Sequence, residues 1–287
     1  MDTVRRCVSI ILCLSFSQSL CAKDEPHIDV FVIAHSEGKD LSGLALCQGK
    51  LVTVADNVND TIFKIVIEGD GATLKPITAL PIIAPEKTVS YGFIHTIKYF
   101  LDGLRGTGDR VDWEGVTCTE EAYFLVSERK LGVLKISDQE SRWLNLDFYD
   151  KALKDGYLRN YNGFVEAIVH SGNTLYVFLE RQERGVITIT GFEGEPEVKI
   201  SSLDNDLGLR YVNDSYDVAG AFIDEGYLYL LERNASSVCK RRLEEFKTLD
   251  CISYAHIENA AAYEFKGADS KLGEGLALDD DYIYIVF

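Results

Sequence analysis

A short motif that occurs five times along the chain limits the possible folds more than any other feature. In one copy, Glu114 opens an alternating apolar stretch, the chain turns at Glu120, and a second stretch closes on Glu128. The other copies open at Ser42, Glu166, Ala219 and Glu274. Repeats of about 50 residues made of short alternating strands are typical of a β-propeller, in which each copy forms one four-stranded blade.

We therefore predict an all-β fold, a single propeller of five blades, with six as the alternative if the sequence continues beyond residue 287. The chain has 287 residues, of which 46% are hydrophobic and 26% charged, so it can bury a large core. Residues 28–35 read as a strand that completes the last blade and closes the ring. The last copy lacks a third strand, and we expect an acidic residue directly after Phe287.

One insertion separates the first two copies. Apolar residues recur at helical spacing over residues 89–104, which predicts an amphipathic helix packed on one face of the ring, with a lid as the alternative interpretation. A second, shorter helical turn is expected at Tyr149 to Lys154.

Residues 1–22 have the layout of a secretory signal peptide. Arg5 and Arg6 precede an apolar run from Val8 to Phe16, and small and polar residues follow up to Ala22. The run is too short to span a bilayer comfortably, and no later stretch reaches about 18 apolar residues. We predict cleavage after Ser19 or Ala22, a propeller domain over residues 23–287, and a periplasmic or secreted location.

The chain is strongly acidic, with a net charge of -17. Such a surface repels nucleic acid and anionic membranes and attracts cations or basic partners. The alternative is that acidity only keeps an exported protein in solution. We expect a monomer with no nucleic-acid partner.

Four cysteines remain beyond the predicted signal peptide, in a compartment that permits disulfides. Cys239 and Cys251 lie symmetrically about the turn of one hairpin, so we predict a bridge between them. Cys47 and Cys118 follow the opening motif in neighbouring blades and read as buried thiols, although a bridge between them stays open.

The acidic residues that open and close the copies are the candidate site. Glu114 and Glu128 lie equally far from the turn between them, so antiparallel pairing brings both carboxylates to one end of the hairpin, at one mouth of the central channel. Carboxylates this close repel unless cations neutralise them, and calcium suits such oxygen ligands. The alternative is that they cap strand ends. The candidate metal ligands are Asp56, Glu114, Glu128, Glu166, Glu180, Glu232 and Glu274.

Three arginines follow closing acids and share this face: Arg129, Arg181 and Arg233. The planar guanidinium group of arginine binds phosphate and carboxylate groups, so these side chains are candidates to orient an anionic ester. The alternatives are that they neutralise the acids or that they are solvated loop charges. No motif supplies a nucleophile, and the catalytic residues are left unassigned.

As a set, these segments resemble the "esterase-like activity of phytase" family and the related SdiA-regulated propellers of bacterial envelopes. The resemblance covers about residues 36–287 and is carried by Asp112-Trp113-Glu114-Gly115-Val116, Ser127-Glu128-Arg129, Gly163-Phe164-Val165-Glu166-Ala167, Leu179-Glu180-Arg181, Leu231-Glu232-Arg233 and Glu274-Gly275-Leu276-Ala277, with Ser42-Gly43-Leu44 and Ala55-Asp56-Asn57 in the first copy. It implies an exported bacterial propeller that binds calcium and hydrolyses phosphate or other esters. Ala219 in place of an opening acid departs from a symmetric metal ring.

Two functions follow as hypotheses. The first is a phytase-like hydrolase that uses a divalent cation at the axial mouth. The second is a non-catalytic propeller that binds a protein or an envelope ligand through the same face.

Overall fold

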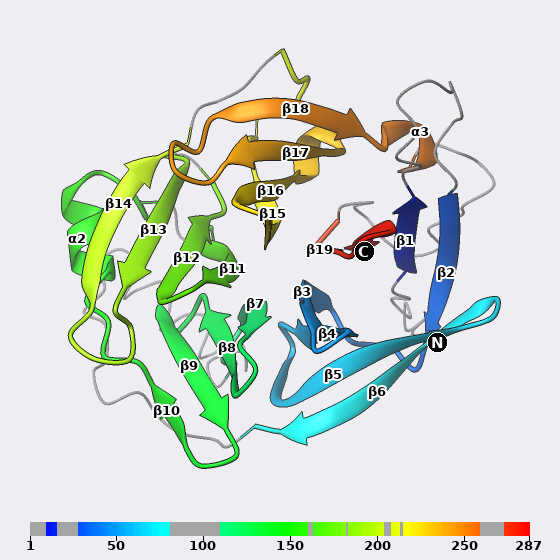
Figure 1. Cartoon of the computed structure of the whole chain (residues 1–287), viewed down its shortest axis with the longest axis horizontal. Coiled ribbons are helices and arrows are strands. Elements are labelled where there is room, and N and C mark those ends of the chain that lie inside the picture. Colours follow the sequence, from blue (N-terminus) through cyan, green and yellow to red (C-terminus); the bar gives the residue numbers. More distant parts are fainter. Residues whose placement is uncertain are drawn as a thin grey trace, which may run out of the picture.

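The computed structural model describes residues 10–15, 28–80, 110–159, 163–181, 183–203, 208–212, 215–258 and 273–287. Nearly all regular structure in these residues is antiparallel β-sheet, arranged around one axis as a propeller (Figure 1). None of the helices in this part of the chain has the length and apolar character needed to cross a membrane. The predicted helix at 89–104 lies outside the described residues.

Three blades are separate four-stranded sheets in which each strand pairs with the next along the chain. The second blade contains β7 (Trp113–Cys118), β8 (Ala122–Ser127), β9 (Gly132–Ser137) and β10 (Ser141–Trp143). The third contains β11 (Val165–Ser171), β12 (Thr174–Leu179), β13 (Gly185–Thr190) and β14 (Glu197–Ser202). The fourth contains β15 (Val218–Asp224), β16 (Tyr227–Glu232), β17 (Ser237–Arg242) and β18 (Thr248–Ser253).

The first and last blades are joined in one eight-stranded sheet. The first blade consists of β3 (Leu41–Cys47), β4 (Lys50–Ala55), β5 (Val58–Glu68) and β6 (Gly71–Ala79). The last consists of β19 (Gly275–Leu278), β20 (Tyr282–Val286), β1 (Ile10–Ser15) and β2 (Ile28–Ala34). A short parallel contact, Ile33 with Ala72 and Ala34 with Thr73, connects β2 to β6. If a sheet is defined by its hydrogen bonds, the described residues therefore form four sheets.

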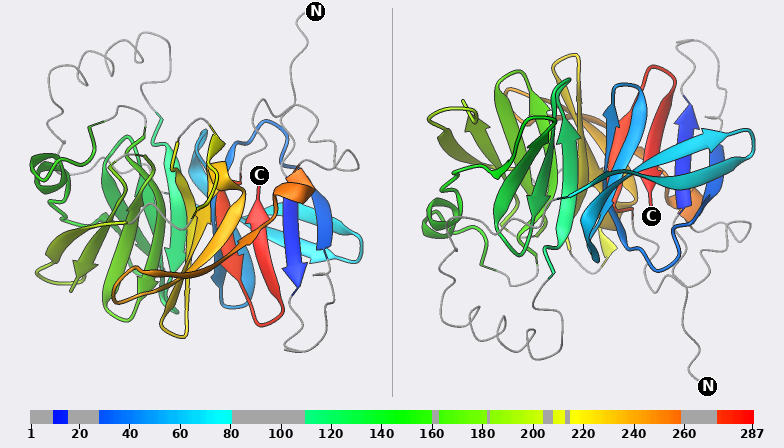
Figure 2. Two further views of the ribbon diagram at one scale, coloured as in Figure 1. Left: turned by 90° about the horizontal axis from the view of Figure 1, so that it is seen from above. Right: turned by 90° about the horizontal axis from the view of Figure 1, so that it is seen from below.

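The innermost strands nevertheless form a ring of five. Neighbouring contacts run from β3 to β7, β11, β15 and β19 and return to β3. The side views in Figure 2 show these strands running along the axis. The predicted propeller with four-stranded blades is confirmed. The strand over residues 28–35 also closes the last blade as expected, as the outermost strand β2.

The missing third strand of the last blade is a correction. We expected the given sequence to supply no third strand for this blade, but β1 fills the position, pairing antiparallel with both β20 and β2. The six residues of β1 belong to the predicted signal peptide. An apolar run of this length suits either a signal peptide or a buried strand, and sequence periodicity does not separate the two.

The core lies between blades rather than inside a single sheet. Phe124 and Val126 of β8, for example, pack in one cluster with Ile168 and Val177 of the third blade. Inner strands are thus covered on both faces, which explains their nearly continuous apolar sequences. The helix α2 (Tyr149–Lys154), where a helical turn was predicted, adds Tyr149 and Ala152 to the same cluster. Two shorter elements, η2 (Arg233–Ala235) and α3 (Ala255–Glu258), follow β16 and β18.

Both pairs of cysteines beyond residue 22 form disulfides. Cys239 and Cys251 are opposite each other on β17 and β18, with Cα atoms 4.1 Å apart. Cys47 and Cys118 link the ends of β3 and β7, so the buried-thiol interpretation of this pair is wrong. This second bridge ties neighbouring blades together. Two disulfides are consistent with an extracytoplasmic protein.

Glycine lines the axis because the innermost strands approach very closely. A Cβ atom on Gly43 would lie 2.7 Å from the Cα of Gly115, and one on Gly220 would lie 2.7 Å from the backbone nitrogen of Leu276. One on Gly275 would be 2.7 Å from the carbonyl carbon of Gly43. Side chains at these positions would push neighbouring blades apart.

Gly220→Ala is therefore expected to lower the free energy of unfolding by about 2–3 kcal/mol, through overpacking against backbone that cannot move alone. Gly71→Ala is the control, because a Cβ there meets nothing closer than 3.9 Å. It should change stability by no more than about 0.5 kcal/mol. Urea unfolding of both variants measures this difference, and equal losses would show that the close approach at the axis does not limit the packing.

Candidate cation site at the axial mouth

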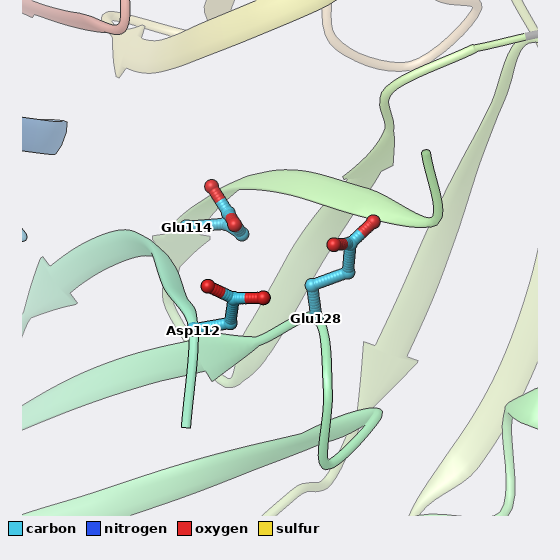
Figure 3. Close-up of side chains that lie close together, drawn as sticks. All are labelled: Asp112, Glu114 and Glu128. Atoms are coloured by element: carbon cyan, nitrogen blue, oxygen red, sulfur yellow. The ribbon is translucent and has the colours of Figure 1, made fainter. Parts of the chain in front are cut away.

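The site lies where the first strand of a blade begins and its second strand ends. Asp112 directly precedes β7 and Glu114 is within it, while Glu128 directly follows β8. Trp113 pairs with Ser127, and the backbone N–H of Glu128 donates to the carbonyl oxygen of Asp112 over 3.0 Å. Strand pairing therefore brings three carboxylates to one point of the mouth (Figure 3).

These carboxylates form a compact group. One oxygen from each of Asp112, Glu114 and Glu128 lies within 4.8 Å of the others. The hydroxyl of Ser42, from the neighbouring blade, donates to Glu114 Oε2 over 3.2 Å. The backbone N–H of Phe164, from the blade on the other side, donates to Glu128 Oε1 over 2.9 Å. Neighbouring blades thus hold the group in place, and this buried acidic cluster could bind a metal ion.

The electrostatics of this group favour a proton or a cation. Burial raises the pKa of Glu128 to about 7, against the hydrogen bond from Phe164. Burial also raises the pKa of Glu114 well above its ordinary value, and the charge of Glu128 raises it further. Asp56 has a pKa raised to about 7 by burial and by the charges of Asp40 and Asp112. Its Oδ1 is buried and accepts no hydrogen bond from the described residues.

Little positive charge reaches this half of the mouth in the described residues. The Nε of Arg129 donates to Asp112 Oδ2 over 2.8 Å. Among the described residues, neither Glu114 nor Glu128 forms an ion pair with a guanidinium. The charge of Arg129 lowers the pKa of Glu128 and that of Arg110 lowers the pKa of Asp56, but both pKa values remain raised. A bound cation fits this arrangement.

In the other half of the mouth, Arg233 supplies a central positive charge. Its guanidinium contacts carboxylate oxygens of Glu166 at 2.8 Å, Glu180 at 2.7 Å, Glu274 at 2.6 Å and Asp217 at 3.3 Å. The Arg233 side chain is only 7% exposed. The surrounding carboxylates raise the pKa of Arg233, so it stays charged.

Strand register explains how an arginine came to this position. Val218 pairs with Glu232 as Trp113 pairs with Ser127 and Val165 with Leu179. The residue after each of these partners points to the mouth. That residue is Glu128 in the second blade, Glu180 in the third and Arg233 in the fourth. The fourth blade therefore has a cation where the two preceding blades have an acid.

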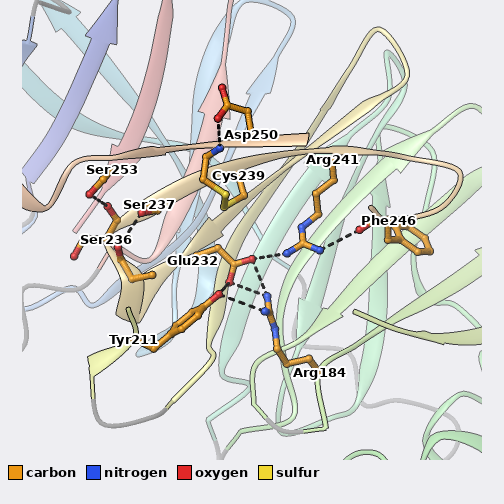
Figure 4. Close-up of a disulfide and its surroundings, with 12 residues drawn as sticks. Arg184, Tyr211, Glu232, Ser236, Ser237, Cys239, Arg241, Phe246, Asp250 and Ser253 are labelled. Atoms are coloured by element: carbon orange, nitrogen blue, oxygen red, sulfur yellow. Dashed lines mark hydrogen bonds and ion pairs between the residues drawn. A yellow bond between two sulfur atoms is a disulfide. The ribbon is translucent and has the colours of Figure 1, made fainter. Parts of the chain in front are cut away.

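Glu232 is a correction to the predicted ligand set. It is fully buried away from the group of Asp112, and its carboxylate accepts bonds from Arg184 at 2.7 Å, Arg241 at 3.0 Å and the Tyr211 hydroxyl at 3.0 Å (Figure 4). Two guanidinium groups already satisfy it. Glu232 holds the third and fourth blades together and is not a ligand at the mouth.

No family model and no curated protein matches the sequence. Among solved structures, the chain is similar to a glutaminyl cyclase from Myxococcus xanthus, with a TM-score of 0.51 and 9% identity over 87% of this chain and 90% of that one. It is also similar to a structure of a nidogen/laminin complex, with a TM-score of 0.49 and 11% identity over 96% of this chain and 84% of that one. At 9% identity, the likeness to the glutaminyl cyclase shows the propeller fold alone.

The predicted arginines differ in how far a ligand can reach them. Arg233 is enclosed by four carboxylates, so it does not fit the role of orienting an anion. Arg129 is 12% exposed and bound to Asp112. Arg181 is 42% exposed and contacts Glu180 at 3.0 Å and Asp217 at 3.9 Å. Of the three, Arg181 is the one that a ligand at the mouth could contact.

Asp112 and Asp217 were missed by the sequence interpretation, although a signal was present. Each lies two residues before the opening position of its copy, and Asp40 has the same place in the first copy. Since that residue directly precedes the first strand, it reaches the mouth together with the closing acid.

Proposed function

We propose that the group of Asp112, Glu114 and Glu128 binds one divalent cation, and that this cation is calcium. The observation that carries the proposal is the crowding of three carboxylates within 4.8 Å, beside a single contacting guanidinium in the described part of the chain. In the matching half of the mouth the Arg233 guanidinium contacts all four carboxylates, whereas Glu114 and Glu128 form no such ion pair among the described residues. The resemblance noted in the sequence also implies calcium.

The chemistry of the group favours calcium over other metals. All three side chains offer hard oxygen atoms, and calcium accepts six to eight of these in flexible geometry. Magnesium demands nearly octahedral ligands, and zinc prefers histidine and cysteine, neither of which belongs to this group. Three protein ligands would leave coordination positions for water or a ligand.

We further propose that the ligand is an anionic ester and that the reaction is its hydrolysis, as the resemblance to phytase-like propellers implies. A bound calcium ion would polarise an oxygen of the ester. Arg181 can hold the anion, because its side chain is exposed at the mouth. Asp56, whose pKa burial raises to about 7, is suited to accept a proton from water near neutral pH.

Binding without catalysis is the second candidate. Arg233 is enclosed and Arg129 is paired, so the mouth offers fewer free cations to an anionic substrate than the sequence suggested. A protein or envelope ligand held through the bound cation would also fit this face. Both proposed functions include export of the protein.

Calorimetric titration of calcium into the EDTA-treated full chain tests the cation site. We expect one ion per chain and at least about tenfold weaker binding in the double variant Glu114→Gln with Glu128→Gln, which loses two charged ligands. Glu121→Gln is the control, because it removes one charge from an exposed hairpin turn between β7 and β8. If the double variant and the control bind alike, the cation site is elsewhere.

Phosphate release from phytate by the same sample then separates the two candidates. Release that requires calcium and falls in Arg181→Met supports hydrolysis. Stoichiometric calcium binding without release from phytate or from simple phosphate and carboxyl esters leaves the binding function.

A further inference from the structure

The third-strand position of the last blade differs from the same position in every other blade. In the other four blades the third strand follows the second through a short connection, as β5 follows β4 and β17 follows β16. In the last blade the second strand is β20 and the third is β1, which comes from the opposite end of the sequence. The covalent link between β1 and the rest of the blade passes through residues 16–27.

The position is defined on both sides by strand edges. β1 has five register pairs with β2, from Ile10 with Val32 to Leu14 with Ile28. It has five more with β20, from Ile11 with Val286 to Ser15 with Tyr282. Both pairings are antiparallel. Without β1, two rows of backbone groups would face each other across an open gap, which is the arrangement that accepts an added strand.

Buried apolar residues also line the position and limit which side chains of an occupying strand fit there. Ile11 is 0% exposed and belongs to a cluster with Ile33, Ala277 and Val286. Cys13 is 3% exposed and is the free cysteine of the described residues. Residues 11 and 13, two apart on the strand, thus face buried surroundings, so an occupant needs small or medium apolar residues at alternate positions.

We propose that the gap between β20 and β2 is a strand-acceptor site, which binds an extended apolar peptide antiparallel to both edges and does not require that peptide to be continuous with the chain. The segment Ile10–Ser15 is its occupant in this structure. The same segment is the apolar part of the predicted signal peptide, and cleavage after Ser19 or Ala22 would cut its link to β2. The site would then be able to take a strand of the same chemistry from a partner protein.

A split-chain experiment tests this proposal. A specific protease site is placed between Ala22 and Lys23 of the full chain, with Cys7→Ser and Cys21→Ser to leave Cys13 as the thiol of the segment. The folded chain is cleaved, unfolded in urea with its disulfides intact, and refolded with excess fluorescent peptide of residues 9–16. We expect the peptide to co-elute with the refolded cleaved chain. The uncleaved chain should exclude it, because its own strand acts at a high effective concentration.

Two controls keep the result specific. A peptide carrying Ile11→Asp should bind at least about tenfold more weakly, because it places a carboxylate among apolar side chains. Cys13 should resist iodoacetamide in the folded uncleaved chain and react in urea, since it is buried and burial raises the pKa of its thiol to about 12.

Any of the following results would overturn the proposal. Equal reactivity of Cys13 in the folded chain and in urea would mean that β1 does not occupy the position. A cleaved chain that refolds without taking up the peptide, or that takes up the Ile11→Asp peptide equally well, would show that no strand-acceptor site exists. A cleaved chain that fails to refold with the peptide, while the uncleaved chain succeeds, would show that the covalent link is required.

Discussion

Arg233→Met is expected to lower the free energy of unfolding by about 3–5 kcal/mol at pH 8, the largest effect of a single substitution at the mouth. The guanidinium contacts four carboxylates, three of them closer than 3.0 Å. Methionine keeps most of the apolar volume and removes the charge, so the carboxylates are left buried and repelling one another. Urea unfolding followed by tryptophan fluorescence measures the loss.

Arg181→Met is the matched control for this prediction. Arg181 follows Glu180 in the same mouth, and its side chain is 42% exposed. Solvent screens its ion pairs, so its loss should cost no more than about 1 kcal/mol. The loss in Arg233→Met should also shrink at pH 5, because burial raises the pKa values of Glu166, Glu180 and Glu274 and these carboxylates take up protons there. Equal losses in both variants would mean that Arg233 does not hold the mouth together.

The architecture followed from the sequence because its signals are local. Each copy carries its own two strands and turn, and inner strands that are buried on both faces have recognisable apolar runs. Two features needed long-range information. The place of β1 depends on its pairing with β20 and β2, and the Cys47–Cys118 disulfide depends on how neighbouring blades approach. Neither contact can be predicted from the residues near it in the sequence, because each joins segments that lie far apart along the chain.

The sequence predicted only part of the candidate site, and the main error of that prediction was the strand register in the fourth blade. The Glu-Arg pairs at 128, 180 and 232 look equivalent, but Glu128 and Glu180 lie fourteen residues after an opening acid, whereas Arg233 lies fourteen residues after Ala219. Strand pairing follows the spacing rather than the dipeptide. A shift by one residue turns a side chain to the other face of a strand, which sends Glu232 to a buried cluster and Arg233 to the axis.

The second large effect is a pH dependence of stability that calcium reverses. Without divalent cations, the free energy of unfolding is expected to fall as pH rises from about 4.5 to above 7. Burial raises the pKa of Glu128 and Asp56 to about 7 in the folded chain, from 4.5 and 3.8. Between these values the folded state holds protons that the unfolded chain releases, so raising the pH favours unfolding. Above the folded pKa the loss is complete.

Calcium should act in the opposite direction and chiefly above pH 7, where protons no longer compete for the carboxylates. At a free concentration of about 100 times its Kd, it would add about 2.7 kcal/mol, which corresponds to several degrees in Tm for a chain of this size. Differential scanning calorimetry in EDTA and in calcium, at pH 5.5 and at pH 8, gives the four Tm values that test this prediction.

The same measurement on Glu128→Gln distinguishes a cation site from a purely structural ring of acids. Glutamine keeps the hydrogen bond from the Phe164 N–H to a side-chain oxygen but carries no charge and binds no proton in this range. The variant should therefore lose part of the fall in stability with pH and most of the stabilisation by calcium. A parent chain whose Tm in EDTA instead rises between pH 5.5 and pH 8 would mean that Phe164, Arg129 and Arg110 stabilise these carboxylates as anions. The mouth would then have no need of a metal ion.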